Sequence, residues 1–195
     1  MNYQKLRQLK DKNYFSTREV ASVLDVKTES SKVICLRLLK RGLLIRLKRD
    51  FYILRERWDI LTEEDFFNIS NILQVPSYIS FMSALTYYEV STQVYRNFFE
   101  NVSVKRTKDF EVEGTIFNYY KIQKDLFFGF IKRDNFFISE KEKAFVDILY
   151  LHSLGRYEFD LSSISLNKLN KNKIEKFLTK YPIKTEKFFN KIWKN

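Results

Sequence analysis

Hydrophobic and polar positions in the first sixty residues alternate in patterns that predict three helices followed by a hairpin. A short amphipathic helix is expected over residues 3–12. Ser16, followed three positions later by Glu19, forms a capping box that starts a second helix, because each side chain can bond a free backbone amide. After a tight turn, a third helix is expected over residues 29–41. It ends at Gly42, which readily adopts the left-handed conformation of a helix end.

The third helix is predicted to have a buried face and an exposed one. Thr28 is expected to cap it, since a threonine hydroxyl accepts a hydrogen bond from an amide of the first turn. The buried face is predicted from residues at helical spacing, namely Ser31, Ile34, Cys35 and Leu38. Four residues fall toward the N-terminus and the outer surface: Ser30, Lys32, Val33 and Arg37. Leu36 and Leu39 fit neither face, and we expect them to pack beneath the hairpin or against a second domain.

The hairpin is predicted from strands at residues 43–47 and 51–54, joined by the turn Lys48-Arg49-Asp50. Two helices, a tight turn and a basic hairpin together are typical of a winged helix-turn-helix, whose second helix reads the DNA major groove. We expect that helix to contact DNA through Thr28, Ser30, Lys32, Val33 and Arg37. The hairpin, or wing, is expected to contact backbone phosphates through Arg46, Lys48 and Arg49.

The remaining chain predicts a mixed α/β domain with a helical tail. Helices are expected over residues 62–73, 80–90 and 139–151, the first capped by Thr62 and the last by a box of Ser139 and Glu142. Strands are expected at residues 101–106, 109–112 and 115–122, with two more around Lys132 and a turn at Glu113-Gly114. Tail helices are expected at 169–181 and 185–194. The predicted fold class is therefore α+β, with a winged helix-turn-helix at residues 1–58 and the mixed α/β domain at 59–195.

Charge is unevenly distributed along the chain, whose net charge is +11. Residues 1–60 carry +8 and residues 161–195 carry +7, whereas residues 61–160 carry −4. Segregation of this kind indicates a polyanionic partner. An AT-biased genome would also enrich lysine, above all in the tail, but it explains the arginines between residues 37 and 57 less well.

Composition also indicates the cellular compartment in which the protein is expected. A single cysteine fits a reducing environment, and the first residues lack the apolar core of a signal peptide. The chain has no run of about 18 apolar residues, the length that a membrane helix needs. We therefore expect a cytoplasmic protein without a membrane segment.

Residues suited to catalysis are scarce. His152 is the only histidine and Cys35 the only cysteine, so no structural zinc set can form. The chain also lacks a phosphate-binding glycine-rich loop. The best acidic group consists of Glu140, Glu142 and Asp147, but acids in the first turn of a helix are explained by stabilisation of the helix dipole. We expect no enzymatic activity, no metal and no cofactor.

Several segments, taken in order, resemble the AbiEi-like antitoxins of type IV toxin–antitoxin systems. They are RGLLIRLKRDFYIL, PSYISFMSALTYYEV, SVKRTKDFEVEGTIFNYYKI, LFFGF and SEKEKAFVDILYL, within residues 10–155. The resemblance implies a repressor that autoregulates its operon, and an antitoxin that opposes a nucleotidyltransferase-like toxin without a stable complex. The family usually has a glycine at the wing turn, where this chain has Arg49-Asp50.

Three functions remain open from the sequence. The first is a DNA-binding repressor acting on its own operator, with antitoxin activity and cooperative self-association on DNA. The second is an RNA-binding or nuclease-like effector that uses the same basic surface. The third is a protein-interaction module whose charge serves solubility. Lys105, Arg106 and Lys108 are candidates for a second basic surface, although charge at these positions can also protect an exposed strand edge.

Overall fold

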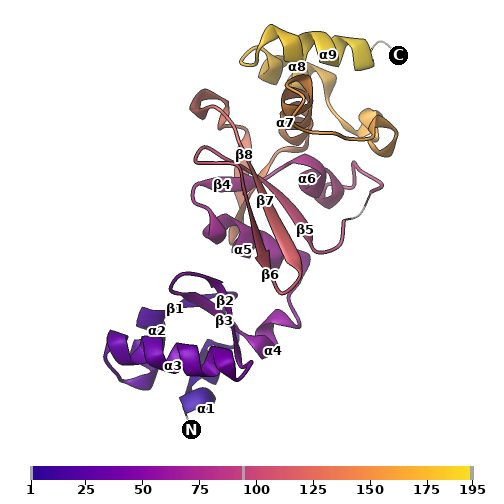
Figure 1. The fold of residues 1–195 in the computed structure, drawn as a ribbon. Helices are drawn as coiled ribbons and strands as arrows, with labels where there is room; N and C mark the ends of the chain where they lie inside the picture. Colours follow the sequence, from indigo (N-terminus) through magenta and orange to yellow (C-terminus); the bar gives the residue numbers. More distant parts are fainter. Residues whose placement is uncertain (1, 94, 194–195) are drawn as a thin grey trace.

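The computed structural model describes residues 2–93 and 95–193 (Figure 1). Their buried hydrophobic side chains form two cores. Residues 2–58 are called here the N-terminal unit. Its helices are α1 (Asn2–Leu6), continued by a 3-10 turn at Arg7–Leu9, then α2 (Thr17–Leu24), α3 (Thr28–Lys40) and α4 (Arg55–Trp58). Its strands β1 (Phe15–Ser16), β2 (Leu44–Lys48) and β3 (Phe51–Leu54) form an antiparallel sheet in the order β1-β3-β2.

Local signals set some of the helix ends in the N-terminal unit. The predicted capping box of Ser16 and Glu19 is present at the start of α2. The prediction that Thr28 caps α3 is wrong, because Lys27 takes the N-cap position in an extended conformation and Thr28 is already helical. Gly42 follows the end of α3 with φ +67°, as predicted. The first helix is shorter than expected, since regular turns stop at Leu9.

The hairpin of β2 and β3 lies between the two cores. Residues on one of its faces pack into the N-terminal core: Leu44, Tyr52 and Leu54. Residues on the other face join the larger core: Ile45, Leu47 and Ile53. The turn is shorter than predicted, Arg49-Asp50, and Asp50 adopts the left-handed φ of 62° where a glycine would be unstrained. Leu36, by contrast, does not pack beneath the hairpin, because its side chain is 51% exposed.

A mixed six-stranded sheet forms the framework of residues 59–193, here called the C-terminal unit. Its strands are β4 (Ser77–Ile79), β5 (Phe98–Ser103), β6 (Lys108–Val112), β7 (Thr115–Lys121), β8 (Phe130–Arg133) and β9 (Phe136–Ser139). They pair in the order β6-β7-β5-β4-β9-β8. The pairs β5–β7 and β4–β9 are parallel and the others are antiparallel. The turn at Glu113-Gly114 joins β6 to β7 with both residues at positive φ, as a two-residue hairpin requires.

Helices pack on this sheet and on one another. The sheet contacts α5 (Glu63–Leu73), along β4 and β9, and α6 (Phe81–Tyr87), along β5. Helix α7 (Lys141–Ser153) packs on α6 and is covered by α8 (Lys171–Leu178) and α9 (Ile183–Trp193). Short 3-10 turns occupy Lys124–Leu126, Leu161–Ser163 and Leu166–Lys168. The tail helices thus cap the C-terminal unit.

Two capping predictions in the C-terminal unit had different outcomes. Thr62 caps α5 and forms a box with Asp65. The predicted box of Ser139 and Glu142 does not form, because Ser139 ends strand β9 and Glu140 is the N-cap of α7. The Glu142 carboxylate instead accepts a hydrogen bond from the backbone amide of Asn170, ahead of α8.

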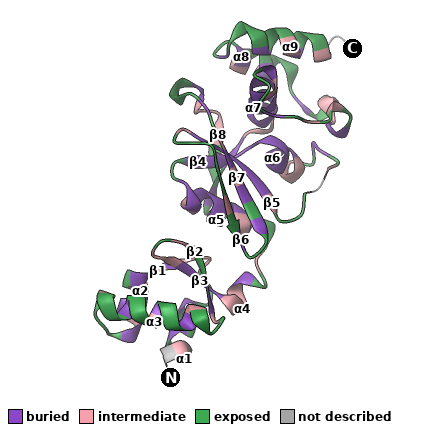
Figure 2. Ribbon diagram, in the orientation of Figure 1, coloured by how far each residue is buried: buried purple, intermediate pink, exposed green. Residues whose placement is uncertain are grey.

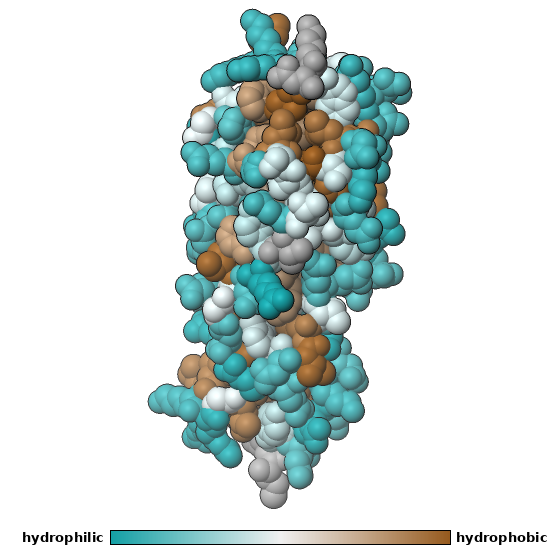
Figure 3. Space-filling view, turned by 90° about the vertical axis from the view of Figure 1, so that its right-hand side faces the viewer, coloured by the Kyte–Doolittle hydropathy of each residue, from teal (hydrophilic) through white to brown (hydrophobic). Residues whose placement is uncertain are grey.

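Burial follows this layering (Figure 2). The central strands and α7 are largely buried, whereas one side of α3 and much of α8 and α9 are exposed. The face seen in Figure 3 is mostly hydrophilic, with an apolar area toward its upper end. Among the described residues, no helix combines the length and apolar character needed to cross a membrane.

Candidate nucleic-acid interface

The outer face of α3 is exposed along its length (Figure 2). Ser30, Lys32, Val33 and Arg37 are all exposed, and Thr28 is half-buried at the first turn. On the opposite side, the buried residues are Ser31, Cys35 and Leu38, with Ile34 partly covered. The predicted division of this helix into an inner and an outer face is confirmed.

The exposed face of α3 combines positive charge with apolar surface. Lys32, Arg37 and Lys40 are exposed on it, and Glu29 is the one acid in the helix. Val33 is 48% exposed and Leu36 is 51% exposed. Lysine and arginine can pair with DNA phosphates, and exposed aliphatic side chains can contact the thymine methyl group in the major groove. The exposed face of α3 is therefore compatible with duplex DNA.

Buried polar contacts fix the position of α3. The Ser31 hydroxyl donates to the backbone carbonyls of Thr17, at 2.7 Å, and Thr28, at 2.8 Å, which ties α3 to the start of α2. Cys35 is fully buried, and burial raises the pKa of its thiol to about 11. A thiol of that pKa is unreactive at neutral pH, so Cys35 serves packing.

The two arginines of the hairpin point into solvent. The Arg49 side chain is 90% exposed, with its Nε 3.7 Å from the Asp50 carboxylate. Arg46 is also exposed, and its Nε lies 3.4 Å from the backbone carbonyl oxygen of Lys48. Asp50 therefore offsets part of the positive charge at the turn, while both guanidinium groups remain accessible.

Lys48 is placed differently from these arginines. Its ammonium group donates a hydrogen bond to the backbone carbonyl of Ile72, near the end of α5. It also lies 4.6 Å from the centre of the Phe51 ring. Burial and the nearby charge of Lys105 lower the pKa of Lys48. The structure thus directs Lys48 toward the C-terminal unit, although the sequence grouped it with Arg46 and Arg49.

The second basic segment predicted from the sequence meets the hairpin at this point. Lys105 and Arg106 are exposed, and together with Lys48 they line a hollow of about 390 Å³. The backbone carbonyl of Arg106 accepts a hydrogen bond of 2.8 Å from the Gln74 side chain. Lys108 is exposed beside them, its ammonium 4.3 Å from the centre of the Phe110 ring. Residues far apart in the sequence therefore form one basic cluster.

The candidates for catalysis are engaged in structural contacts. His152 packs against the rings of Phe159 and Phe188, and its Nδ1 lies 2.9 Å from the carbonyl oxygen of Tyr157. Glu140 forms an ion pair with Lys173. Within residues 2–93 and 95–193, no cluster of three or more histidine, cysteine or acidic side chains could hold a metal ion.

A buried ion pair inside α7 could not be predicted from the sequence. Lys143 and Asp147 are both fully buried, with Nζ 2.5 Å from the carboxylate. Three hydroxyl groups also donate to that carboxylate, from Tyr78, Ser80 and Tyr181. Burial lowers the pKa of Lys143, and the neighbouring carboxylate opposes that effect. This enclosed network connects α7 to β4 and to the tail. Asp147, one of the three acids that the sequence analysis grouped, is therefore part of a structural contact.

Glu100 is a second buried acid. It is 3% exposed on β5 and accepts hydrogen bonds from the Tyr157 hydroxyl, at 2.8 Å, and the Met82 amide, at 3.0 Å. Burial raises the pKa of Glu100 to about 7, although both hydrogen bonds oppose the shift. Its site is closed by protein groups, which indicates a structural role.

Comparison with known proteins does not assign this geometry to a family. The chain matched no family model, no curated protein and no solved structure.

Proposed function

We propose that the protein is a sequence-specific DNA-binding transcriptional repressor in which residues 1–58 act as a winged helix-turn-helix. The observation that carries this proposal is the exposed face of α3, which includes Lys32 and Arg37, together with the short basic hairpin that follows α3 in the chain. A helix of this kind fits the major groove, and the hairpin then lies against the neighbouring backbone.

In this proposal, residues of α3 contact bases and residues of the hairpin contact phosphates. Side chains toward the N-terminus of α3 meet base edges and set the preferred sequence: Thr28, Ser30, Lys32, Val33 and Arg37. Arg46 and Arg49 of the hairpin meet phosphates, which adds affinity without adding sequence preference. Lys105, Arg106 and Lys108 supply further positive charge beside Lys48.

The resemblance to AbiEi-like antitoxins supports a more particular proposal. In it, the repressor binds its own operator in the cytoplasm, with cooperative self-association on repeated half-sites. The C-terminal unit opposes a nucleotidyltransferase-like toxin without forming a stable complex with it.

RNA binding is the second candidate function. The cluster of Lys48, Lys105 and Arg106 favours it, because Phe110 lines the same hollow and aromatic rings can stack on unpaired bases. A nuclease activity has less support, since Asp147 is enclosed in its ion pair with Lys143 and Glu140 is paired with Lys173.

The proposal is tested by replacing the cations of α3. The double variant Lys32→Ala/Arg37→Ala is expected to lose the preference for the upstream sequence of its own gene over a scrambled duplex. The matched control is Lys184→Ala/Lys187→Ala, which removes two exposed lysines of α9. Equal loss of preference in both variants, or no loss in either, would refute the role of α3.

A further inference from the structure

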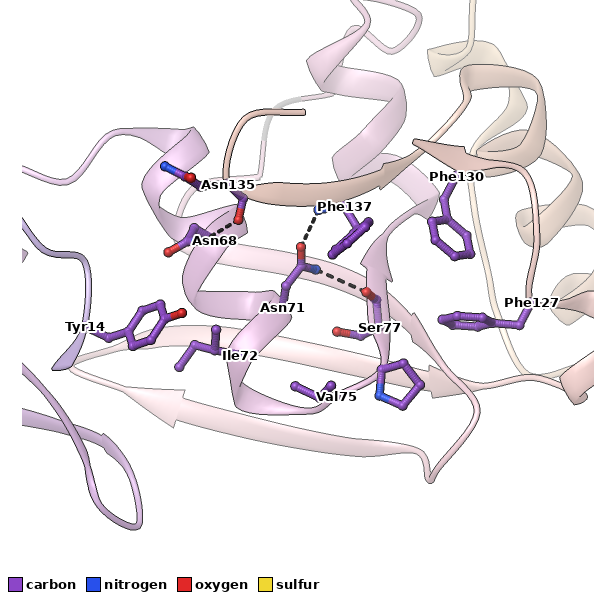
Figure 4. Close-up of a pocket in the computed structure, with 11 residues that line it drawn as sticks. Tyr14, Asn68, Asn71, Ile72, Val75, Ser77, Phe127, Phe130, Asn135 and Phe137 are labelled. Carbon is purple, nitrogen blue, oxygen red and sulfur yellow. Dashed lines mark hydrogen bonds between the residues drawn. The ribbon is translucent and has the colours of Figure 1, made fainter. Parts of the chain in front are cut away.

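A hollow of about 330 Å³ lies where the N-terminal unit meets the C-terminal unit (Figure 4). Tyr14 reaches it from the N-terminal unit, and Ile72, Val75 and Ser77 line it from the end of α5 to β4. We call this hollow the junction pocket. Its volume falls in the range of small-molecule binding sites.

One wall of the junction pocket is aromatic. The ring centres of Phe127 and Phe130 are 5.0 Å apart, and those of Phe130 and Phe137 are 6.0 Å apart with their planes at 84°. These three rings border the same hollow and differ in orientation, and Phe130 is also stacked on Tyr78. Such an array favours a flat ring, which can stack on one phenylalanine and meet the edge of another.

Amide side chains hold the walls in place. The Asn71 carboxamide accepts a hydrogen bond of 2.5 Å from the Phe137 amide, and its nitrogen lies 3.5 Å from the Ser77 carbonyl oxygen. The Asn68 side chain donates to the carbonyl of Asn135. These contacts link α5 to β4 and β9, so the pocket is shaped before any ligand binds (Figure 4).

Two hydroxyl groups belong to the lining of the pocket, those of Tyr14 and Ser77. Ser77 is 6% exposed, and its Oγ is buried in the wall with no hydrogen-bond partner among the described residues. Figure 4 shows this hydroxyl and that of Tyr14 directed toward the hollow. The residues that line the pocket include no lysine, arginine, aspartate or glutamate. A charged ligand would lose its hydration there without a counter-charge, so the lining selects an uncharged one.

We propose that the junction pocket binds an uncharged, planar aromatic small molecule, with a hydrogen-bonding group toward Ser77 and Tyr14, and that this binding regulates DNA affinity. The regulatory part rests on the proposed function. Its structural basis is the position of Tyr14, which directly precedes β1. Strand β1 pairs with Phe51 and Tyr52 of the hairpin, so a ligand against Tyr14 acts on the element that carries Arg46 and Arg49.

Binding is tested with N-phenyl-1-naphthylamine, an uncharged aromatic fluorophore with one N–H group. Its emission is expected to rise, shift to shorter wavelength and saturate at one molecule per chain. Phe137→Glu, which places a charge at a 40% exposed position of the pocket, should weaken binding at least tenfold. Ile183→Glu on α9, at a 69% exposed position outside the pocket, should leave it unchanged. Circular dichroism melting establishes that both variants fold. Absence of saturable binding, or equal weakening in both variants, would overturn the site.

Regulation is tested in the same protein with a duplex that carries the sequence upstream of its own gene. Saturating fluorophore is expected to change the apparent Kd for this duplex at least threefold in the native chain, and not in Phe137→Glu. An unchanged Kd despite saturable binding would overturn the regulatory part alone. A chain that binds the fluorophore but no duplex would refute the proposed function, while the pocket would stand.

Discussion

The Lys48 ammonium group donates a hydrogen bond to the backbone carbonyl of Ile72, and so joins the hairpin of the N-terminal unit to the last turn of α5. The same hairpin places Ile45 and Leu47 in the larger core. These contacts hold the hairpin against the C-terminal unit in the free protein. In the DNA complex that we propose, Arg46 and Arg49 are the hairpin cations left to meet phosphates.

The different placements of the hairpin cations predict different effects of their removal. Arg46→Ala/Arg49→Ala should weaken binding to all duplexes. It should also flatten the plot of log K against log salt by about 2, since each phosphate contact contributes about 0.9 to the slope. Lys48→Met should instead lower the free energy of unfolding by about 1 kcal/mol, the usual net contribution of one hydrogen bond, and leave the slope nearly unchanged. Salt titrations and urea unfolding measure the two effects. Equal flattening by both variants would contradict this division.

Glu100 predicts a dependence of stability on pH. Burial raises its pKa from 4.5 to about 7 in the folded protein, so between these pH values the folded chain holds a proton that the unfolded chain has released. The contribution of Glu100 to the free energy of unfolding is therefore fully present below about pH 4.5 and is lost as the pH rises through about 7. Glu100→Gln should remove this fall, which amounts to about 3 kcal/mol.

The measurement for Glu100 is urea unfolding at pH 5 and pH 8. The native chain should lose more stability between these two pH values than Glu100→Gln. The control is Glu111→Gln, which changes an exposed glutamate on β6 of the same sheet. If the native chain and Glu100→Gln showed the same difference between pH 5 and pH 8, the assignment would be wrong.

The buried pair of Lys143 and Asp147 predicts a strong coupling. Asp147→Asn should lower the free energy of unfolding by about 3–5 kcal/mol, because it leaves the Lys143 ammonium buried without a counter-charge. The double variant Lys143→Met/Asp147→Asn should be less destabilised than the sum of the two single variants, by about 1–3 kcal/mol. Chemical unfolding of the four proteins gives this coupling energy, and strict additivity would exclude a stabilising interaction between the two charges.

Gly129 is predicted to be required beside Lys143. A Cβ at Gly129 would lie 3.0 Å from Lys143 Cγ, and its φ of +70° is already unfavourable for alanine. Gly155 offers a matched control, because its φ is +68° but a Cβ there would meet nothing within 4 Å. Gly129→Ala should therefore cost about 1 kcal/mol or more beyond Gly155→Ala. Equal melting temperatures of the two variants would show that the added methyl group is accommodated.

Features encoded by neighbouring residues could be predicted from the sequence. The caps at Ser16 and Thr62 and the turn at Glu113-Gly114 depend on a few consecutive residues, and each is present. The exposed face of α3 followed from helical periodicity alone. These features are local, so no knowledge of the rest of the fold was needed.

Features that depend on contacts distant in the sequence could not be predicted. The orientation of Lys48 is set by the carbonyl of Ile72, which the hairpin sequence does not reveal. The burial of Lys143 contradicts the usual exposure of lysine, and it depends on Tyr78 and Tyr181 from other elements. The capping box expected at Ser139 does not form for the same reason, because Ser139 is the last residue of strand β9 and pairs within the sheet.

We propose that α3 recognises a DNA sequence, and the first experiment is to measure binding of the intact protein to the DNA upstream of its own gene. The competitor is a scrambled duplex of the same composition, and both are measured at two salt concentrations. Sequence recognition by α3 should give a preference well above tenfold that persists at the higher salt, because base contacts depend less on salt than phosphate contacts do. Equal, salt-sensitive binding to both duplexes would contradict it, and would leave only a basic surface without sequence recognition.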